Sequence, residues 1–279
     1  MTLPRLARTI ALAVIIAIGI FNVYQAVIGW TLSDAAAYWQ AGLRLRADEE
    51  LYPTLASVDA SDVYRYAPWF AWLAVPWTFL PIQVAGVLWS GLLLAASAAA
   101  LLPLFRSGSW VLISLFGPIL IGISAVGNVH PLLIAGLALG VERRSGPLWV
   151  ALAASLKIFP LLFALVYAGR REWWRLGAAV ALTAILWVPA LVYDLANYAT
   201  DPGNAGMLAN VPILFAVVAV VAVVTTLAAA RTQWAWLAAA TTVCLSVPRF
   251  FVYDVTYLMV GVPTGPSPAR HASRKIRAP

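Results

Sequence analysis

The stretch from Ile82 to Leu104, IQVAGVLWSGLLLAASAAALLPL, contains no charged side chain. About 20 apolar residues in an α-helix cross the roughly 30 Å hydrocarbon core of a bilayer, so this stretch is long enough to span a membrane. Similar apolar stretches recur along the whole chain, which is 63% hydrophobic and only 10% charged. Soluble domains carry roughly 25% charged residues. The sequence therefore predicts an all-α, polytopic membrane protein.

The apolar stretches predict about eight or nine membrane segments in a single transmembrane domain, residues 1–263. The predicted crossings are residues 9–30, 82–104, 110–126, 131–141, 174–192, 211–230, 234–248 and 250–262. A further stretch, residues 147–169, is interrupted at Lys157 and Pro160 and has arginines near both of its ends. We expect it to form a re-entrant hairpin, which needs protein or a water-filled cavity around its irregular backbone.

The basic residues predict how the chain is oriented, because loops rich in Lys and Arg stay on the cytoplasmic side. Arg5 and Arg8 would hold the N-terminus inside. If residues 67–80 lie along the outer interface without crossing, the arginines of the later loops also fall inside, and most acidic residues fall outside. We therefore expect a multi-pass plasma-membrane protein with a cytoplasmic N-terminus.

The first extracytoplasmic loop is predicted to span residues 31–81. Trp69, Trp72 and Trp77 in this loop fit a short interfacial helix, because amphipathic indole rings favour the membrane–water interface. At the other end of the chain, residues 264–279 are rich in proline and arginine. We expect them to form a disordered basic tail in the cytoplasm that touches anionic lipid.

On this topology, polar and charged side chains gather on the outer side of the membrane. A carboxylate can take a proton from an acceptor hydroxyl, and cations can stabilise a departing phosphate, so this mixture suits a site that handles sugars. Ionisable side chains near hydrocarbon are costly and tend to be functional. The candidate site residues are Asp34, Tyr38, Arg65, Tyr66, Asn128, His130, Lys157, Arg249 and Asp254.

Several of these residues also have a structural alternative. Asp34 follows Ser33 and could cap a helix, which is compatible with a chemical role. Lys157 could extend its ammonium group toward an interface, although it lies in the middle of its segment. His130 precedes Pro131 and could be a turn residue.

The arginines and aromatic residues have alternatives of the same kind. Arg249 follows a proline at the end of a predicted crossing and could anchor it at the interface. Arg65 could pair with Asp62, an exposed ion pair of little energetic value. Most tyrosines and tryptophans fit an interfacial belt, and Tyr66 is the best candidate for stacking on a sugar.

The sequence contains no Walker loop, no paired-cysteine metal pattern and no Rossmann glycine fingerprint. Its single cysteine, Cys244, rules out an internal disulfide. The formal net charge of +7 is explained by the membrane topology, so we expect no nucleic-acid partner. We also expect no metal and no nucleotide cofactor, and the sequence predicts no particular oligomeric state.

At its polar landmarks the sequence resembles the family-87 glycosyltransferases, which are membrane-embedded, polyprenyl-phosphate-dependent enzymes of the GT-C class. The matching landmarks are Asp34 with Tyr38–Gly42, Leu51-Tyr52, Tyr66–Pro68, Gly127-Asn128 with Leu132-Leu133, and Ser155–Pro160. The resemblance extends over about residues 30–175 and weakly to Asp254. The family usually has Gly-Gln where this chain has Gly127-Asn128. It is also usually longer, so we expect a compact or truncated member.

The resemblance implies a GT-C-like fold and a hexosyltransferase that moves a sugar, mannose first among the candidates, from a polyprenyl phosphate to a glycolipid or glycan acceptor with inversion. Asp34 matches the position of the catalytic base. Lys157, Arg249 and Arg65 would hold the donor phosphate. The expected sugar and acceptor contacts are Tyr38, Tyr66, Asn128, His130 and Asp254. The partners would be membrane lipid, the lipid-linked donor and the acceptor, with no metal or cofactor.

Two other classes of protein fit parts of the pattern. A non-catalytic lipid-binding membrane protein, such as a flippase subunit or an assembly partner, would need only the cationic pocket, whereas an enzyme also needs an accessible base at Asp34. A coupled transporter would be expected to show inverted repeats and broken helices in both halves of the chain. The sequence has one broken segment and no internal repeat, which disfavours a transporter.

Overall fold

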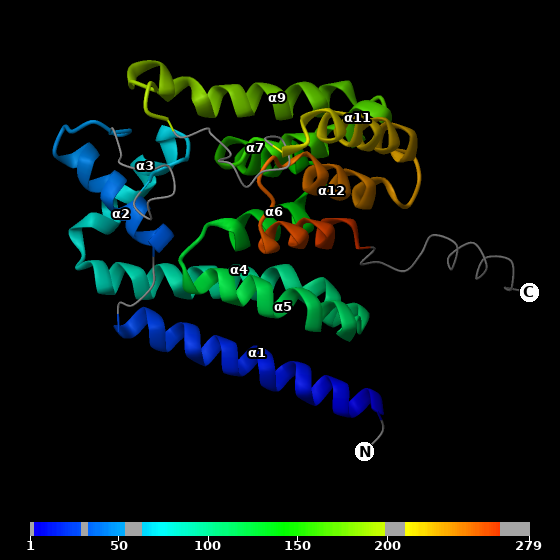
Figure 1. Cartoon of the computed structure of the whole chain (residues 1–279), viewed down its shortest axis with the longest axis horizontal. Helices are drawn as coiled ribbons and strands as arrows, with labels where there is room; N and C mark the ends of the chain where they lie inside the picture. Colours follow the sequence, from blue (N-terminus) through cyan, green and yellow to red (C-terminus); the bar gives the residue numbers. More distant parts are fainter. Residues whose placement is uncertain (1–2, 29–32, 54–62, 199–209, 263–279) are drawn as a thin grey trace, which may run out of the picture.

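The computed structural model describes residues 3–28, 33–53, 63–198 and 210–262, and over these residues all regular structure is helical. The elements are α1 (Leu3–Ile28), α2 (Ser33–Arg46), α3 (Pro68–Ala74), η1 (Val75–Phe79), α4 (Ile82–Ser107), α5 (Trp110–Ala125), α6 (His130–Gly140), α7 (Gly146–Leu156), η2 (Phe159–Phe163), α8 (Ala164–Gly169), α9 (Trp173–Trp187), η3 (Val188–Val192), α11 (Pro212–Ala229), α12 (Ala235–Ser246) and η4 (Val252–Gly261), where η marks a 3-10 helix. The longer helices lie side by side in layers, and α2 and α3 cover one end of them (Figure 1). The predicted basic tail, residues 264–279, lies outside the described residues.

Three helices in the described part of the chain are long and apolar enough to cross a membrane. They are α4, α9 together with η3 (Trp173–Val192), and α11. Only 6% of the α11 window is buried, so most of its apolar side chains face outward, as expected for a helix in contact with lipid. These features support the predicted all-α membrane protein. The other apolar helices are shorter, and the expected eight or nine crossings stay a prediction.

Residues 250–262 were predicted to be a membrane crossing, and the structure corrects this. They contain η4, a 3-10 helix of 10 residues. A 3-10 helix rises about 2.0 Å per residue, so η4 reaches about 20 Å and cannot cross a hydrocarbon core of about 30 Å. It packs against α12, α6 and α5, with Tyr257 and Met259 buried. This segment is therefore a core element that brings residues toward the site.

The interrupted stretch 147–169 turns back at Lys157 as a hairpin, while its re-entrant placement in a membrane stays a prediction. Helix α7 ends at Leu156, and Lys157 has extended backbone torsions, with φ −139° and ψ 114°. The chain then returns through η2 and α8. The Tyr167 hydroxyl donates to the Val141 carbonyl oxygen over 2.8 Å, in the loop that leads into α7, and also lies against Gly146 at the start of α7. Lys157 consequently lies at the tip of the hairpin.

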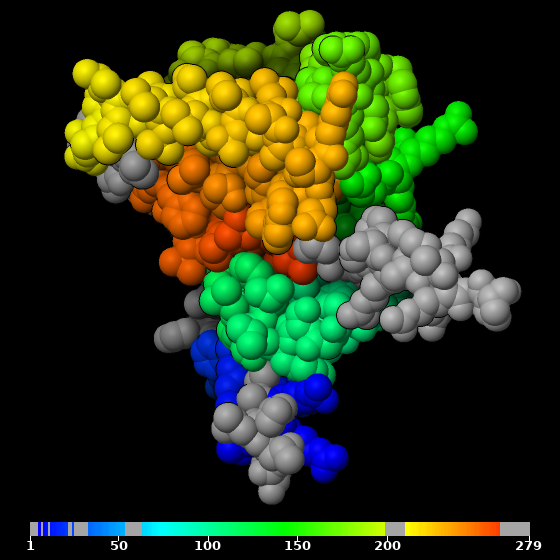
Figure 2. Space-filling model, turned by 90° about the vertical axis from the view of Figure 1, so that its right-hand side faces the viewer, coloured from blue at the N-terminus to red at the C-terminus, as the bar shows by residue number. Residues whose placement is uncertain are grey.

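The loops at the end remote from α2 are joined by arginines. Arg170 forms an ion pair with Glu142 over 3.2 Å and donates to the backbone of the α11–α12 loop. Arg175 donates to two carbonyls of the α6–α7 loop, and Arg231 donates to the Gly169 carbonyl over 3.2 Å. Figure 2 looks onto this end, where α11 and α12 lie side by side. Arginines that were predicted to share one side of the membrane therefore do meet at one end of the molecule.

The start of α2 is attached to the turn between α5 and α6. The Asp34 amide donates to the Val126 carbonyl oxygen over 3.0 Å. Gly127 in this turn has φ +75°, and a Cβ added there would lie 2.5 Å from Ala35 Cβ and 2.9 Å from Ala35 N. Only glycine allows α2 to approach the turn this closely. The Gly127 carbonyl also accepts from Trp89 Nε1 over 2.6 Å, which ties the turn to α4.

We predict that Gly127→Ala will destabilise the protein. A non-glycine residue at this φ costs about 1–2 kcal/mol, and the new Cβ adds a clash with Ala35, so the free energy of unfolding should fall by about 2 kcal/mol or more. Thermal unfolding of the purified protein in detergent measures the change. Gly122→Ala is the matched control, since a Cβ at Gly122 in α5 meets nothing within 4 Å. An equal melting temperature for the two variants would contradict the proposed packing.

Candidate functional site

The centre of the site is a hydrogen bond between Asp34 and Asn128. Asp34 lies in the first turn of α2, and its Oδ2 accepts from Asn128 Nδ2 over 2.5 Å. Asn128 is only 4% exposed, and its Oδ1 accepts from the backbone amide of His130 over 2.9 Å. Both ends of the amide are thus engaged, so its orientation is determined. Asn128 holds one carboxylate oxygen of Asp34, while the Asp34 side chain stays partly exposed.

The surroundings of Asp34 act on its pKa in opposite directions. Burial raises the pKa above its ordinary value. The hydrogen bond from Asn128 and the positive charges of Lys157 and Arg65 lower it, without cancelling the effect of burial. A carboxylate with a raised pKa is a stronger base than an exposed one. The arrangement therefore suits proton abstraction from a neutral hydroxyl.

Lys157 supplies a positive charge at the tip of the hairpin. Its Nζ lies 4.4 Å from the centre of the Tyr253 ring, a cation–π distance. Its charge acts on both Asp34 and Asp254. In the described part of the chain, however, no ion pair within 4.0 Å joins Lys157 to either carboxylate. The ammonium group therefore has hydrogen-bonding capacity for an anionic ligand.

The segment that carries Arg65 and Tyr66 is clamped through its backbone. Three tyrosine hydroxyls donate to three successive carbonyl oxygens. The pairs are Tyr198 with Arg65 over 3.0 Å, Tyr52 with Tyr66 over 2.8 Å, and Tyr64 with Ala67 over 2.8 Å. We call these three tyrosines the tyrosine clamp. They hold the backbone from which the Arg65 and Tyr66 side chains reach toward Asp34. The alternative partner of Arg65, Asp62, lies outside the described residues.

Tyr38 joins this segment to the α5–α6 turn. It is buried, and its hydroxyl accepts from the Val129 amide over 3.3 Å and donates to the Tyr66 hydroxyl over 3.1 Å. Because the Tyr66 oxygen is the acceptor in that bond, its own proton can be donated to another group. The pKa of Tyr66 is raised, first by burial and then by the Asp34 charge, so the phenol stays protonated. Tyr66 is partly exposed and can donate to a ligand, whereas Tyr38 supports it from behind.

Two residues predicted to contact sugar or acceptor lie behind the site. His130 is fully buried, and its Nε2 lies 2.8 Å from Thr256 Oγ1. Since the Thr256 hydroxyl donates to the Tyr253 carbonyl, the histidine Nε2 must be the donor. Asp254 is 3% exposed, and its carboxylate accepts from the Phe251 amide over 2.9 Å at the start of η4. These positions do not support direct contact with a sugar, because both side chains are enclosed by their own chain.

Arg249 lies on the approach to η4. Its guanidinium lies 5.1 Å from the centre of the Phe251 ring. The cations that act on Asp34 are Lys157 and Arg65, so these two are grouped with the carboxylate. The predicted set thus separates into partly exposed side chains around Asp34 and buried side chains that support them.

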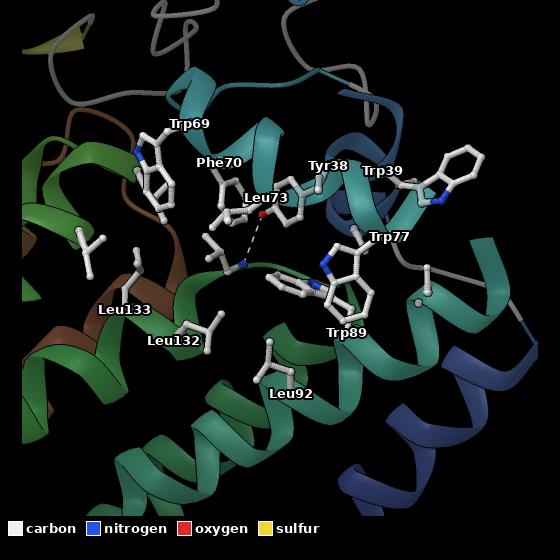
Figure 3. Close-up of a pocket in the computed structure, with 18 of the residues that line it drawn as sticks. Tyr38, Trp39, Trp69, Phe70, Leu73, Trp77, Trp89, Leu92, Leu132 and Leu133 are labelled. Atoms are coloured by element: carbon white, nitrogen blue, oxygen red, sulfur yellow. Dashed lines mark hydrogen bonds between the residues drawn. The ribbon is translucent and has the colours of Figure 1, made fainter. Parts of the chain in front are cut away.

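An apolar cavity of about 480 Å³ opens beside this polar group. Helices α4, α6 and α7 form its walls, and residues of α2, α3 and η1 form its roof. Figure 3 shows aromatic rings of the roof facing leucines of α4 and α6 across the space. Trp69 of the roof donates through Nε1 to Ser155 Oγ over 3.2 Å, which fixes α3 on α7. Tyr38 and Val129 border both the cavity and the polar group, so the two are contiguous.

Sequence reasoning missed the tyrosine clamp and the support around His130. Tyr52 was noted only as a family landmark, and the three hydroxyls were not expected to bind backbone carbonyls, because no side-chain pattern in the sequence indicates such partners. The contact of Tyr253 with Lys157 was also missed, and the position of Tyr253 next to Asp254 in the sequence was the one signal that could have indicated it. The described residues bring no three His, Cys, Asp or Glu side chains together in a way that could hold a metal ion.

The fold and the site together define a class: a multi-helix membrane protein in which one carboxylate acted on by two cations lies next to an apolar cavity, linked to it through Tyr38 and Val129. The model of glycosyltransferase family 87 matches residues 64–199, just under half of the chain. Over this range, the match confirms the resemblance predicted from the landmarks. Neither a curated protein nor a solved structure matches the chain. The matched range contains Arg65, Tyr66, Asn128 and Lys157, while Asp34 lies before it.

We predict that Tyr198→Phe and Tyr52→Phe will each loosen the segment 63–67. Each change leaves a carbonyl without its donor and should cost about 1 kcal/mol. Because both tyrosines hold the same short segment, their effects should not be additive. Hydrogen exchange of the segment and thermal unfolding measure the two effects. Tyr24→Phe in α1, at an exposed tyrosine, is the control and should be within about 0.5 kcal/mol of the wild type. Wild-type protection in both clamp variants would argue against the clamp.

Proposed function

We propose that this protein is a hexosyltransferase that transfers a sugar, mannose first among the candidates, from a polyprenyl phosphate to a hydroxyl of a glycolipid or glycan. The observation that carries the proposal is the convergence of the partly exposed Asp34 carboxylate with Lys157 and Arg65 beside an apolar cavity. A lipid-linked sugar donor presents an anionic phosphate for the cations and an apolar chain for the cavity, and the acceptor presents the hydroxyl for the base.

The proposed reaction is a single displacement at the anomeric carbon. The acceptor oxygen forms a bond to this carbon while the bond from the carbon to the phosphate oxygen breaks. Asp34 receives the proton of the acceptor hydroxyl, and the electron pair of the broken bond leaves with the polyprenyl phosphate. Lys157 and Arg65 stabilise the charge that develops on the leaving phosphate. One displacement with one base inverts the configuration of the anomeric carbon.

The supporting residues have distinct parts in this proposal. Asn128 orients the Asp34 carboxylate and leaves its second oxygen available to the acceptor. Tyr66 can donate to a sugar or phosphate oxygen, with Tyr38 behind it. We place His130 and Asp254 in support of η4 and Arg249 at the rim before it, so that the bound reactants contact the partly exposed side chains.

We propose that the site faces the outside of the plasma membrane and that the N-terminus is cytoplasmic. The arginine-rich loops lie at the end of the molecule remote from Asp34, and loops of this kind stay in the cytoplasm. The polar group then opens near the outer leaflet, where a polyprenyl donor can enter sideways from the bilayer. The tryptophans of α3 and η1 lie at the same end, as expected for an interfacial segment.

A non-catalytic lipid-binding protein would use the same cations and the same cavity. The Asp34–Asn128 pair favours the enzyme, because a buried amide that holds a partly exposed carboxylate adds nothing to the binding of an anionic lipid. A carboxylate beside a phosphate site would in fact weaken binding through like-charge repulsion. The pair is therefore better explained by chemistry.

We predict that Asp34→Asn will abolish transfer of labelled sugar from polyprenyl-phosphomannose in membranes that contain the protein. The asparagine retains size and can still accept from Asn128 but cannot take a proton, so the rate should fall by about 10²-fold or more. Donor binding and protein level should be unchanged. Lys157→Met should instead weaken donor binding, because it removes the charge and keeps the apolar stem.

The matched control for this experiment is Asp48→Asn, which changes an exposed aspartate with φ +56°, a torsion that asparagine tolerates well. Its transfer rate should equal that of the wild type. If the wild type binds polyprenyl phosphate in a Lys157-dependent way but transfers no sugar to any of a varied set of acceptors, the protein is a lipid-binding relative and the proposal is wrong.

We predict that Asn128→Leu will shift the pH dependence of transfer. The hydrogen bond from Asn128 lowers the pKa of Asp34, so its loss should raise that pKa further. Asp34 must be deprotonated to act as a base. The acidic limb of the pH–rate profile, where protonation of Asp34 stops transfer, should therefore move to higher pH. The expected displacement is about one pH unit, since a hydrogen bond to a charged group contributes about 1.5 kcal/mol or more. An acidic limb at the wild-type position would exclude Asn128 as the group that sets this pKa.

A further inference from the structure

The apolar cavity covers only part of each of the three helices that form its walls. On α4 its lining residues run from Ile82 to Leu92, which is about 15 Å along the helix. On α6 they stop at Gly136, and on α7 they run back from Leu156 only as far as Trp149. Below this level α4 and α6 continue toward the other end of the molecule without lining the cavity. Some structural feature therefore closes the space there.

Trp149 is that feature. Its indole lies directly on the backbone of α6: a Cβ built on Gly136 would be 2.7 Å from Trp149 Cε3, and one built on Gly140 would be closer still. Its Nε1 donates to Ser145 Oγ over 3.2 Å, which holds the ring in this place. The ring therefore covers the surface of α6 from Gly136, the last glycine that lines the cavity, to Gly140, about one helical turn further on.

Without the indole, the cavity would continue along α6 from Gly136 to Gly140. These four residues correspond to about 6 Å of helix, which is close to the length of one isoprene unit. Trp149 is also 37% exposed, so its outer edge borders the space from which a lipid chain would leave sideways. Its position suits a residue that ends the path of the lipid chain into the protein and directs the rest of the chain outward.

We propose that Trp149 determines how many isoprene units of the donor lipid the cavity holds. This inference rests on the proposed function, in which the phosphate of the donor lies at Lys157 and its chain enters the cavity. Units inside the cavity exchange mobile lipid neighbours for close contact with the walls and the aromatic roof. Units beyond Trp149 return to lipid, which is as apolar as the cavity, and gain nothing.

The proposal therefore specifies how affinity depends on chain length. Binding should strengthen with each added isoprene unit until the cavity is full, and then stay constant. The test measures binding of polyprenyl phosphates that differ by single isoprene units to the purified full chain in lipid nanodiscs, at equal mole fraction in the lipid. Trp149→Ala should move the start of the plateau to a chain about one unit longer.

Leu92→Trp keeps the test independent of whether Trp149→Ala folds. Leu92 lies at the inner end of the cavity on α4, so a larger side chain there should shorten the cavity and move the plateau to a shorter chain. Trp173→Ala is the matched control, because Trp173 is a tryptophan with 63% exposure outside the cavity lining. It should leave the plateau where the wild type has it.

The outcomes separate this inference from the proposed function. A wild type without a plateau, a plateau that neither cavity variant moves, or an equal shift in the Trp173 variant would overturn the role of Trp149. Binding requires no sugar and no acceptor, so these results stand whether or not transfer occurs. If the plateau moves as expected but the wild type transfers no sugar, the role of Trp149 holds for a lipid-binding protein and the proposed chemistry fails.

Discussion

The contact between the first turn of α2 and the α5–α6 turn is the constraint on which the site depends. Gly127 allows it, because its positive φ and missing side chain let Ala35 approach the backbone. The Asp34 amide is thereby bonded to Val126, and its carboxylate reaches Asn128 two residues further on. The roof of the cavity is attached to the same place through Tyr38. One close approach of two backbones thus sets the position of the carboxylate and of the apolar cavity beside it.

The site consists of buried side chains that hold its geometry and partly exposed side chains that can contact a ligand. Asn128, Tyr38, His130 and Asp254 are enclosed, and each makes hydrogen bonds within the chain. Buried polar groups of this kind are costly unless they are satisfied, and once satisfied they hold a single geometry. The side chains that face the open space carry the charges and the phenol that a ligand would meet. Proposed catalysis at Asp34 therefore relies on neighbours whose hydrogen bonds hold the site in one geometry.

Much of this organisation could be predicted from local features of the chain. The apolar runs predicted helices with the right positions, and the interruption at Lys157 predicted a hairpin with a charged tip. The grouping of arginines at one end followed from their distribution among the loops. The segment 250–262 was predicted wrongly, because its apolar composition fits both a crossing helix and a buried core element. Only the packing of η4 against α5, α6 and α12 distinguishes the two.

By itself the sequence determined the class of the protein, the helical segments and the residue types from which the site is built, because hydropathy and charge are properties of short stretches of chain. It also contained the landmarks that resemble family 87. Only the tertiary structure decided which polar residues meet and which turn inward, because those contacts join residues far apart in the chain, as Asp34 joins Asn128 and His130 joins Thr256. The same holds for Trp149, whose place at the end of the cavity depends on two glycines of another helix.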